Sequence, residues 1–364
     1  MCSLNILHVL NHVHKIGNGI VNVAVDLACL QARAGYCVGV ASAGGDYESL
    51  LDEYGVTHFK LDQKRTPTNL FKTIKTYRSI IQDFQPDIVH AHMMTGVVLA
   101  KLLGNSEYRL VSTVHNEFQR SAVLMGLADR VIAVSEAVAQ SMQQRGVPKQ
   151  KLRVVCNGTL GSPRTRPLSE YLALPLYRPA ITTVAGMYRR KGIVELIDAF
   201  SQVALVFPTA HLYLVGDGPD RVEFEAQAHN TLVADRIHFE RFQPEPQCYL
   251  LATDIFVLAS HREPFGLVLA EAREAGCAIV ASHVDGIPEA LDAGKAGLLV
   301  PSANSHALTE ALTQLLSDSN YLQEWRRKAQ QNLAWLTADR VTQENINVYR
   351  ELVDSITKGT WSLE

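Results

Sequence analysis

The stretch Ser260-His261-Arg262-Glu263-Pro264-Phe265-Gly266-Leu267-Val268-Leu269-Ala270-Glu271 decides the fold of this chain. The apolar run 254–259 before it predicts a buried strand, and the run 267–276 predicts a helix that ends at a glycine. Glu263 is therefore expected on a strand-to-helix loop and Glu271 inside the helix. The helix N-terminus between the two carboxylates offers backbone N–H groups, which suit an anion, at Phe265, Gly266 and Leu267. Two carboxylates beside an anion site favour a ligand with both hydroxyl and phosphate groups, as in a nucleotide-sugar.

The composition is that of an ordinary globular protein with room for two domains. The chain has 364 residues, 20% of them charged, and its mean hydropathy is +0.01. This length favours two domains that each bury a core. No apolar run approaches the roughly 20 residues of a transmembrane helix, and the first ten residues lack the basic segment and cleavage site of a signal peptide. We therefore expect a cytoplasmic protein.

The charge distribution argues against a nucleic-acid partner. The net charge is −3, whereas nucleic-acid-binding domains carry strongly basic surfaces. Residues 1–163 carry 16 Lys and Arg against 12 Asp and Glu, a net of +4, and residues 164–364 carry 18 against 25, a net of −7. The first half is thus the better candidate to meet an anionic surface. The cysteines lack paired spacing, so we expect free thiols rather than disulfides or zinc ligands at Cys2, Cys29, Cys37, Cys156, Cys248 and Cys277.

Short apolar runs alternate with amphipathic stretches along the whole chain. This alternation predicts a parallel sheet covered by helices in each half. Helices are expected, among others, over 20–34, 70–84 and 136–145. The predicted strands are 5–10, 37–41, 87–91, 109–114, 130–134 and 152–155 in the first half, and 180–185, 211–215, 237–239, 255–258, 278–281 and 297–300 in the second.

A proline-rich stretch separates the two halves. Its prolines disfavour helix and strand alike and predict a linker over 163–179. We therefore expect domains at 1–162 and 180–342, followed by a final helix at 343–364. Both domains are α/β and doubly wound, like the Rossmann fold, and such sheets bind ligands outside the carboxyl ends of their strands.

Several motifs resemble those of the retaining glycosyltransferases of family 4, which have the GT-B architecture. The resemblance covers nearly the whole chain and is most specific in the second half. Besides the Glu263–Glu271 stretch, the motifs there are Val184-Ala185-Gly186-Met187-Tyr188-Arg189-Arg190-Lys191-Gly192, Leu212-Tyr213-Leu214-Val215-Gly216-Asp217-Gly218-Pro219, Gly286-Ile287-Pro288-Glu289 and Gly297-Leu298-Leu299-Val300-Pro301. In the first half they are Pro86-Asp87-Ile88-Val89-His90-Ala91-His92, Thr113-Val114-His115, Val131-Ile132-Ala133-Val134-Ser135 and Asn157-Gly158.

The resemblance implies a fold and a set of site residues. The fold would be two Rossmann-like domains facing a cleft, with the C-terminal helix crossing back onto the first domain. Lys191 would hold the donor's diphosphate, Glu271 would bind the ribose hydroxyls, and Glu263 would contact the transferred sugar. His115 would lie near the anomeric carbon. Each also has a structural alternative, such as a solvated lysine, a carboxylate that favours the helix dipole or a satisfied core histidine.

Two glycines are further donor-side candidates. Gly216 ends a predicted strand in the Gly-Asp-Gly-Pro motif, which by itself is also a common turn. Gly19 belongs to Gly17-Asn18-Gly19, which follows the first strand and opens a helix. This loop is expected to face a phosphate or the acceptor.

One position departs from the family pattern. Family members usually carry an arginine five residues before the lysine of Lys-Gly, and Gly186 stands there in this chain. Arg189 and Arg190 are therefore the candidates to supply the second positive charge at the diphosphate.

The histidines of the first half do not by themselves predict a metal site. His90 and His92 alternate along a predicted strand and so share a face, but no third ligand is apparent near them in the sequence. His8, His12 and His14 give no stronger support. We expect neither a metal nor another cofactor.

The expected reaction is transfer of a sugar from a nucleoside diphosphate donor to a hydroxyl acceptor, with retention at the anomeric carbon. The acceptor would be a sugar, a lipid-linked sugar or a small molecule. A nucleotide-sugar epimerase, a phosphorylase and a non-catalytic nucleotide-sugar binder share this architecture and stay open. A dehydrogenase is disfavoured because the chain has no Gly-x-Gly-x-x-Gly.

The predicted helix over 70–84 carries a basic side. Lys72, Lys75 and Arg78 lie on it, and Lys64 and Arg65 precede it. Such a side is either simply solvated or docks on anionic lipid headgroups. The second interpretation predicts peripheral contact with the inner face of a membrane.

Overall fold

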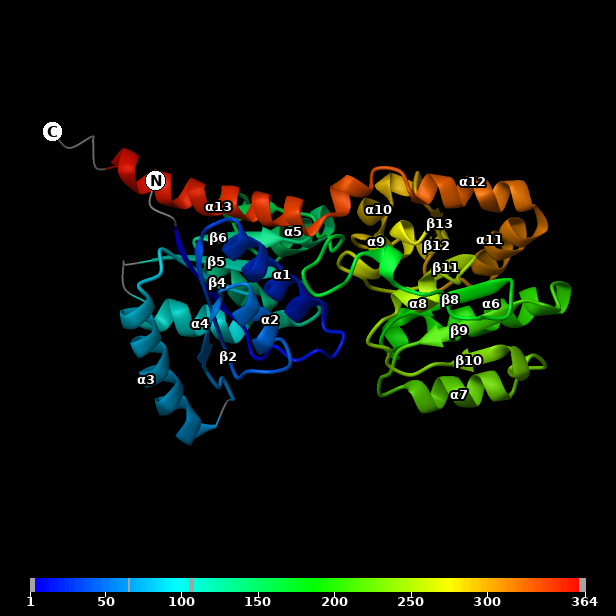
Figure 1. Cartoon of the computed structure of the whole chain (residues 1–364), viewed down its shortest axis with the longest axis horizontal. Coiled ribbons are helices and arrows are strands. Elements are labelled where there is room, and N and C mark those ends of the chain that lie inside the picture. The colour runs from blue at the N-terminus through cyan, green and yellow to red at the C-terminus, as the bar shows by residue number, and fades with distance from the viewer. Residues whose placement is uncertain (1–3, 65, 105–107, 360–364) are drawn as a thin grey trace. The chain divides into compact units, whose positions relative to one another are not determined.

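The computed structural model describes residues 4–64, 66–104 and 108–359, which divide into two α/β units (Figure 1). The first unit combines the chain up to Thr165 with the segment from Thr337 onward, and the second runs from Arg166 to Leu336. Cys2 and Arg65, named above from the sequence, lie outside the described residues. Cys29, Cys37, Cys156, Cys248 and Cys277 are free thiols.

The first unit is built on a seven-stranded parallel sheet in the order β3-β2-β1-β4-β5-β6-β7. The strand order reverses between β1 and β4, so the carboxyl ends of these two strands meet at the switch point of a doubly wound sheet. The strands are β1 (Asn5–Val9), β2 (Cys37–Ser42), β3 (Thr57–Lys60), β4 (Ile88–Ala91), β5 (Arg109–Val114), β6 (Arg130–Ala133) and β7 (Leu152–Val154).

Helices cover both faces of this sheet. They are α1 (Gly19–Arg33), α2 (Glu48–Glu53), α3 (Pro67–Phe84), α4 (Met94–Leu103), α5 (Glu136–Gln144) and α13 (Ala338–Gly359). Alternate strand residues enter two cores, as parallel strands buried on both faces require: Val38 and Val40 pack beneath α1, whereas Leu7 and Val9 pack on the opposite side.

The C-terminal helix α13 belongs to the first unit and packs along α1 (Figure 1). The hydroxyl of Tyr349 accepts a hydrogen bond from the buried amide of Gln31 at 3.2 Å, and Arg33 pairs with Asp339 at 2.6 Å. The predicted return of the C-terminal helix to the first domain is therefore observed.

The second unit repeats the architecture with a six-stranded parallel sheet in the order β10-β9-β8-β11-β12-β13. Its switch point lies between β8 and β11. The strands are β8 (Ala180–Val184), β9 (His211–Val215), β10 (Ile237–Phe239), β11 (Ile255–Leu258), β12 (Ala278–Ser282) and β13 (Leu298–Val300). The helices are α6 (Ile193–Val206), α7 (Arg221–His229), α8 (Gln247–Leu250), α9 (Leu267–Glu274), α10 (Ile287–Ala290), α11 (Ser305–Ser317) and α12 (Ser319–Ala329).

The predicted elements match these bounds to within a few residues, with three differences. The edge strand β3 was not predicted, because its four residues are half-buried or exposed and carry no continuous apolar run. The predicted linker 163–179 is divided between the two units at Thr165, and the predicted boundary at 342/343 falls inside α13. Among the described residues, no helix combines the length and the apolarity that a membrane crossing requires.

Candidate functional site

Lys191 and Glu263 meet at the switch point of the second sheet. Lys191 ends a 3-10 turn (Arg189–Lys191) on the segment that follows β8, and Glu263 lies on the segment that follows β11. Because β8 and β11 are neighbours in the sheet, their carboxyl ends bring the two side chains into contact. The Lys191 ammonium forms an ion pair with Oε2 of Glu263. Both side chains are largely buried, with 14% and 12% of their surface exposed, so the charges face each other in a site with little solvent.

Gly192 holds this lysine against the end of β11. It adopts φ +67°, and a Cβ built on it would lie 1.9 Å from the carbonyl oxygen of Ala259. Only glycine accommodates both that backbone conformation and that approach. The Lys-Gly pair of the motif therefore has a physical reason: the glycine allows the turn that places the lysine.

The Glu263 loop is held from the next motif along the chain. The backbone N–H of Glu263 donates to Oδ2 of Asp285 at 2.9 Å, and the N–H of Gly286 donates to the carbonyl of Glu263 at 3.1 Å. Arg262 also pairs with Asp285, at 2.8 Å. Asp285 was not predicted from the sequence. Its position directly before the motif Gly286-Ile287-Pro288-Glu289 could have indicated it.

Helix α9 begins immediately after this loop, at Leu267. The first N–H groups of a helix have no intrahelical partner and favour an anion, as expected for Phe265, Gly266 and Leu267. The Phe265 ring itself is buried and packs on Trp335 at 6.1 Å between centroids, so only its backbone can serve a ligand. Glu271 lies four residues beyond Leu267, hence on the same face of α9, and is half-buried.

The other predicted donor residues of this unit occupy the neighbouring strand ends. Arg189 is exposed and pairs with Glu223 at 2.6 Å. The Arg190 guanidinium lies over the ring of Tyr188 at 5.4 Å. Gly216 directly follows β9 with φ +141°, where a Cβ would lie 2.0 Å from the Ala185 carbonyl oxygen. Only glycine can therefore lie this close to the segment that leads to Lys191, and this is a structural role of Gly216.

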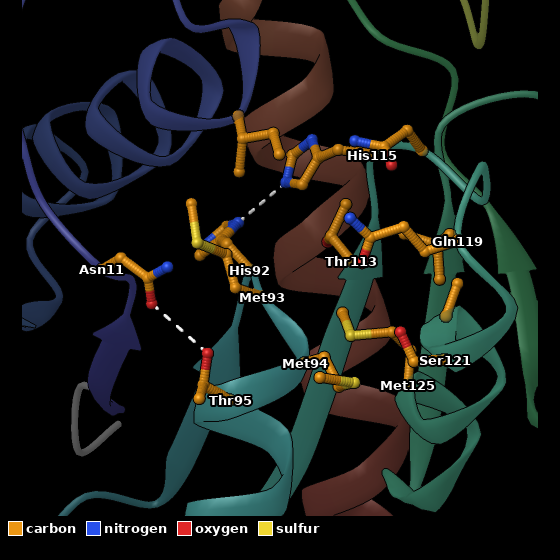
Figure 2. A pocket seen from close by; sticks show the side chains of 14 residues that line it. Asn11, His92, Met93, Met94, Thr95, Thr113, His115, Gln119, Ser121 and Met125 are labelled. Carbon is orange, nitrogen blue, oxygen red and sulfur yellow. Dashed lines mark hydrogen bonds between the residues drawn. The ribbon is translucent and has the colours of Figure 1, made fainter. Parts of the chain in front are cut away.

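His115 lines a pocket of the first unit, of about 290 Å³, at the carboxyl ends of β1, β4 and β5 (Figure 2). Asn11 enters it after β1, His92 after β4, and Thr113 and His115 at the end of β5. Ile20 lines it from the first turn of α1. That helix begins at Gly19, and the Asn18 side chain caps it by accepting from the N–H of Ile20 at 3.0 Å. The structure thus places Gly19 next to the pocket of His115.

The sequence showed no third histidine beside His90 and His92, but the structure supplies one. His8 on β1 is the register partner of His90 on β4, and ring nitrogens of His8, His90 and His92 lie within 4.8 Å of one another. The predictable adjacency of β1 and β4 in a doubly wound sheet was the missed signal. The hydrogen bonds of these rings include His8 Nδ1 to His92 Nε2 at 2.9 Å and His92 Nδ1 to His115 Nε2 at 3.1 Å.

Burial keeps this histidine cluster neutral. Desolvation lowers the pKa of His8 to about 4 and that of His115 to about 3, and it lowers the pKa values of His90 and His92 well below the usual range. Imidazoles buried in this way prefer their uncharged form.

Acid should therefore destabilise the first unit. Below pH 6.5 the unfolded chain takes up protons at these four histidines while the folded chain does not, so the free energy of unfolding falls as the pH is lowered from about 6.5 toward 4. The slope is up to about 1.4 kcal/mol per pH unit for each histidine. Urea unfolding at pH 7 and pH 5 checks this prediction, and equal midpoints would contradict it.

The comparisons with known proteins agree with this architecture. Two family models match the chain: Glycosyl transferases group 1 over residues 169–332 and Glycosyltransferase Family 4 over residues 17–159. The lipopolysaccharide core biosynthesis glycosyltransferase LpsE of Rhizobium meliloti is 27% identical over 193 residues, 53% of this chain and 55% of that protein. N-acetyl-alpha-D-glucosaminyl L-malate synthase of Bacillus anthracis is 24% identical over 267 residues, 68% of this chain and 70% of that protein.

A solved structure extends the likeness to the whole fold. Anabaena HepE in complex with UDP-glucose superposes with a TM-score of 0.80 at 20% sequence identity, covering 97% of this chain and 100% of that chain. Fold and family models together define a glycosyltransferase with the GT-B architecture. More narrowly, the chain belongs to the group 1 glycosyltransferases of family 4.

Proposed function

We propose that this protein is a retaining glycosyltransferase that moves a sugar from a nucleoside diphosphate donor to a hydroxyl acceptor without a metal ion. The observation that carries the proposal is the Lys191–Glu263 pair at the switch point of the second sheet, beside the N-terminus of α9. At the carboxyl edge of this sheet, the cation and the helix N–H groups suit the diphosphate of a donor. The carboxylate suits the hydroxyls of its sugar.

Each group has a role in the proposed reaction. Negative charge grows on the departing diphosphate, and Lys191 with the α9 N-terminus stabilises it. Glu263 and Glu271 accept hydrogen bonds from the hydroxyls of the transferred sugar and of the ribose. The acceptor hydroxyl attacks the sugar from the same face that the diphosphate leaves. The acceptor oxygen bonds to the anomeric carbon as the bond between the sugar and the phosphate breaks, and the leaving phosphate takes the proton of the acceptor hydroxyl. These fixed positive groups supply the charge stabilisation for which other transferases use a metal.

In this proposal His115 lies near the anomeric carbon of the donor sugar, and the Gly19 loop faces a phosphate or the acceptor. They lie at or beside the pocket of the first unit, at the carboxyl edge of its sheet. The names of LpsE and the malate synthase include a lipopolysaccharide core and a small hydroxy acid, so the acceptor proposed here is a sugar, a lipid-linked sugar or a small hydroxylated molecule.

The test is a panel of UDP-, GDP- and ADP-sugars. We expect one donor to raise the melting temperature of the protein and to be hydrolysed slowly when no acceptor is present. With an acceptor, this donor should give a product that keeps the donor's anomeric configuration, at the same rate with and without EDTA. A donor converted to its epimer without an acceptor would indicate an epimerase, and turnover that needs inorganic phosphate a phosphorylase. Binding without any turnover would identify a non-catalytic binder.

We further propose that α3 contacts an anionic membrane surface. Leu70 and Phe71 are 53% and 78% exposed, and the exposed Lys75 and Arg78 follow Phe71 at four and seven residues, so they share its face of the helix. Apolar side chains beside cations suit an interfacial helix at a bilayer of anionic lipid.

Phe71→Ser should reduce binding to vesicles that contain phosphatidylglycerol. Removing a ring that inserts into the interface costs about 1.5–3 kcal/mol, or about tenfold or more in partitioning. Co-sedimentation at low salt measures this effect, and Leu232→Ser is the matched control, since Leu232 is 92% exposed on the other unit. Equal loss in both variants, or equal binding to neutral phosphatidylcholine vesicles, would contradict the membrane contact.

A further inference from the structure

A chain of buried hydrogen bonds connects helix α13 to His115. Gln31 on α1 lies at its centre, with its amide nitrogen 3.2 Å from the Tyr349 hydroxyl and its amide oxygen 2.8 Å from Nε2 of His8. His8 Nδ1 meets His92 Nε2 at 2.9 Å, and His92 Nδ1 meets His115 Nε2 at 3.1 Å. Figure 2 shows this last bond at the pocket.

The orientation of the Gln31 amide determines every proton position along this chain. A neutral imidazole has one donor nitrogen and one acceptor nitrogen. The amide oxygen accepts, so His8 carries its proton on Nε2 and its bare Nδ1 accepts from His92 Nε2–H. The bare Nδ1 of His92 then accepts from His115 Nε2–H. His115 is left with a bare Nδ1, which is the ring nitrogen outside the chain.

A second branch of hydrogen bonds leads from Gln31 through Tyr349 to the same pocket. The Tyr349 hydroxyl accepts from the Gln31 amide and donates to His90 Nδ1 at 2.6 Å. His90 Nε2–H then donates to Oγ1 of Thr113 at 2.7 Å, and Thr113 lines the pocket with His115. In both branches every donor meets an acceptor, and all of the side chains are uncharged.

Burial leaves only two proton arrangements for the network. Gln31, His8, His90 and Tyr349 have no exposed surface, so water cannot supply a missing partner. Rotating the Gln31 amide by 180° would reverse every bond and give His115 a proton on Nδ1. The network therefore has two self-consistent states, and they present opposite hydrogen-bonding character to the pocket.

We propose that Gln31 and Tyr349 are positioning residues that set the tautomer of His115 through the relay of His8 and His92. In the arrangement of this structure His115 presents an acceptor nitrogen, which selects a substrate hydroxyl that donates a hydrogen bond. The C-terminal helix thereby controls the hydrogen-bonding character of His115, which is connected to Tyr349 through Gln31, His8 and His92. Only the identity of that ligand, a sugar or acceptor hydroxyl, rests on the proposed function.

The test is the nitrogen spectrum of protein labelled with ¹⁵N-histidine, in which the two tautomers and metal-bound rings give distinct patterns. We expect wild-type His115 as the pure Nε2–H tautomer, identified by its absence in His115→Asn. Tyr349→Phe removes the acceptor of the amide N–H and should turn His115 into a tautomer mixture. Tyr77→Phe is the matched control, because it removes an equally buried hydroxyl, which pairs with Tyr108 at 3.0 Å in the same unit.

Several results would overturn the relay. They are an unchanged His115 signal in Tyr349→Phe, an equal change in Tyr77→Phe, an Nδ1–H tautomer in the wild type, or metal-bound histidine signals in the purified protein. Gln31→Met supplies a second variant with the same expected mixture. For a working transferase we also expect kcat of Tyr349→Phe to fall about tenfold, as for one lost hydrogen bond. An inactive protein with the expected spectra would refute the proposed function and leave the relay intact.

Discussion

Lys191→Gln is expected to lower kcat for sugar transfer by about 10²–10³-fold, the effect of removing one preorganised group that stabilises transition-state charge. Glutamine keeps a polar stem that can donate to the Glu263 carboxylate, so the partner is not left buried without a hydrogen bond. The charge that would face the diphosphate is lost, while the fold is preserved.

The matched control for this prediction is Lys328→Gln. Lys328 also forms an ion pair, with Glu324 at 2.6 Å, but on the surface of α12 and four residues from its partner. We expect unchanged kinetics there, and melting temperatures of both variants within a few degrees of the wild type. Wild-type kcat in Lys191→Gln, measured at saturating donor, would refute the assigned role of Lys191.

Much of the fold could be predicted from the sequence because parallel strands buried on both faces are short, continuous apolar runs. Ala278–Ser282, for example, is buried throughout, and its run was recognised to within one residue. The strand β3, Thr57–Lys60, escaped because an edge strand covered on one side has no such run. Helix α13 was predicted to begin at 343 rather than at Ala338 because propensity alone places helix ends poorly.

The residues of the candidate site could be predicted from the sequence, but the contacts between their side chains could not. Strand ends place Lys191 and Glu263 at one sheet edge, and the motifs identified both residues. That their side chains contact each other depends on the neighbouring positions of β8 and β11, which the sequence alone does not state. His8 was named from the sequence but was not connected to His90 and His92, although the adjacency of β1 and β4 in a doubly wound sheet made this link predictable. Whether these residues bind the proposed donor stays a prediction.

Arg273→Met is expected to lower the free energy of unfolding of the second unit by about 3–5 kcal/mol, because each buried carbonyl that loses its donor costs about 1–3 kcal/mol. Arg273 lies on α9 and is 1% exposed. Its guanidinium donates to three backbone carbonyls on two segments: Ala329 at 2.9 Å and Gln331 at 2.5 Å at the end of α12, and Ala290 at 2.6 Å on α10. Methionine fills part of the space but leaves these buried carbonyls without their donor. The lost bonds would also loosen α9, whose N-terminus is the proposed diphosphate site.

Two further variants separate this network from a general effect of losing an arginine. Arg327→Met is the control, because Arg327 is exposed and donates to a carbonyl of its own helix, Gln323, at 3.4 Å. The stability of this variant should stay within about 0.5 kcal/mol of the wild type. Arg273→Lys should rescue little, since an ammonium cannot reproduce the planar fork that reaches three carbonyls. Urea unfolding monitored by Trp335 and Trp325 fluorescence measures all three, and a loss below 1 kcal/mol in Arg273→Met would show that α9 is held by its apolar contacts alone.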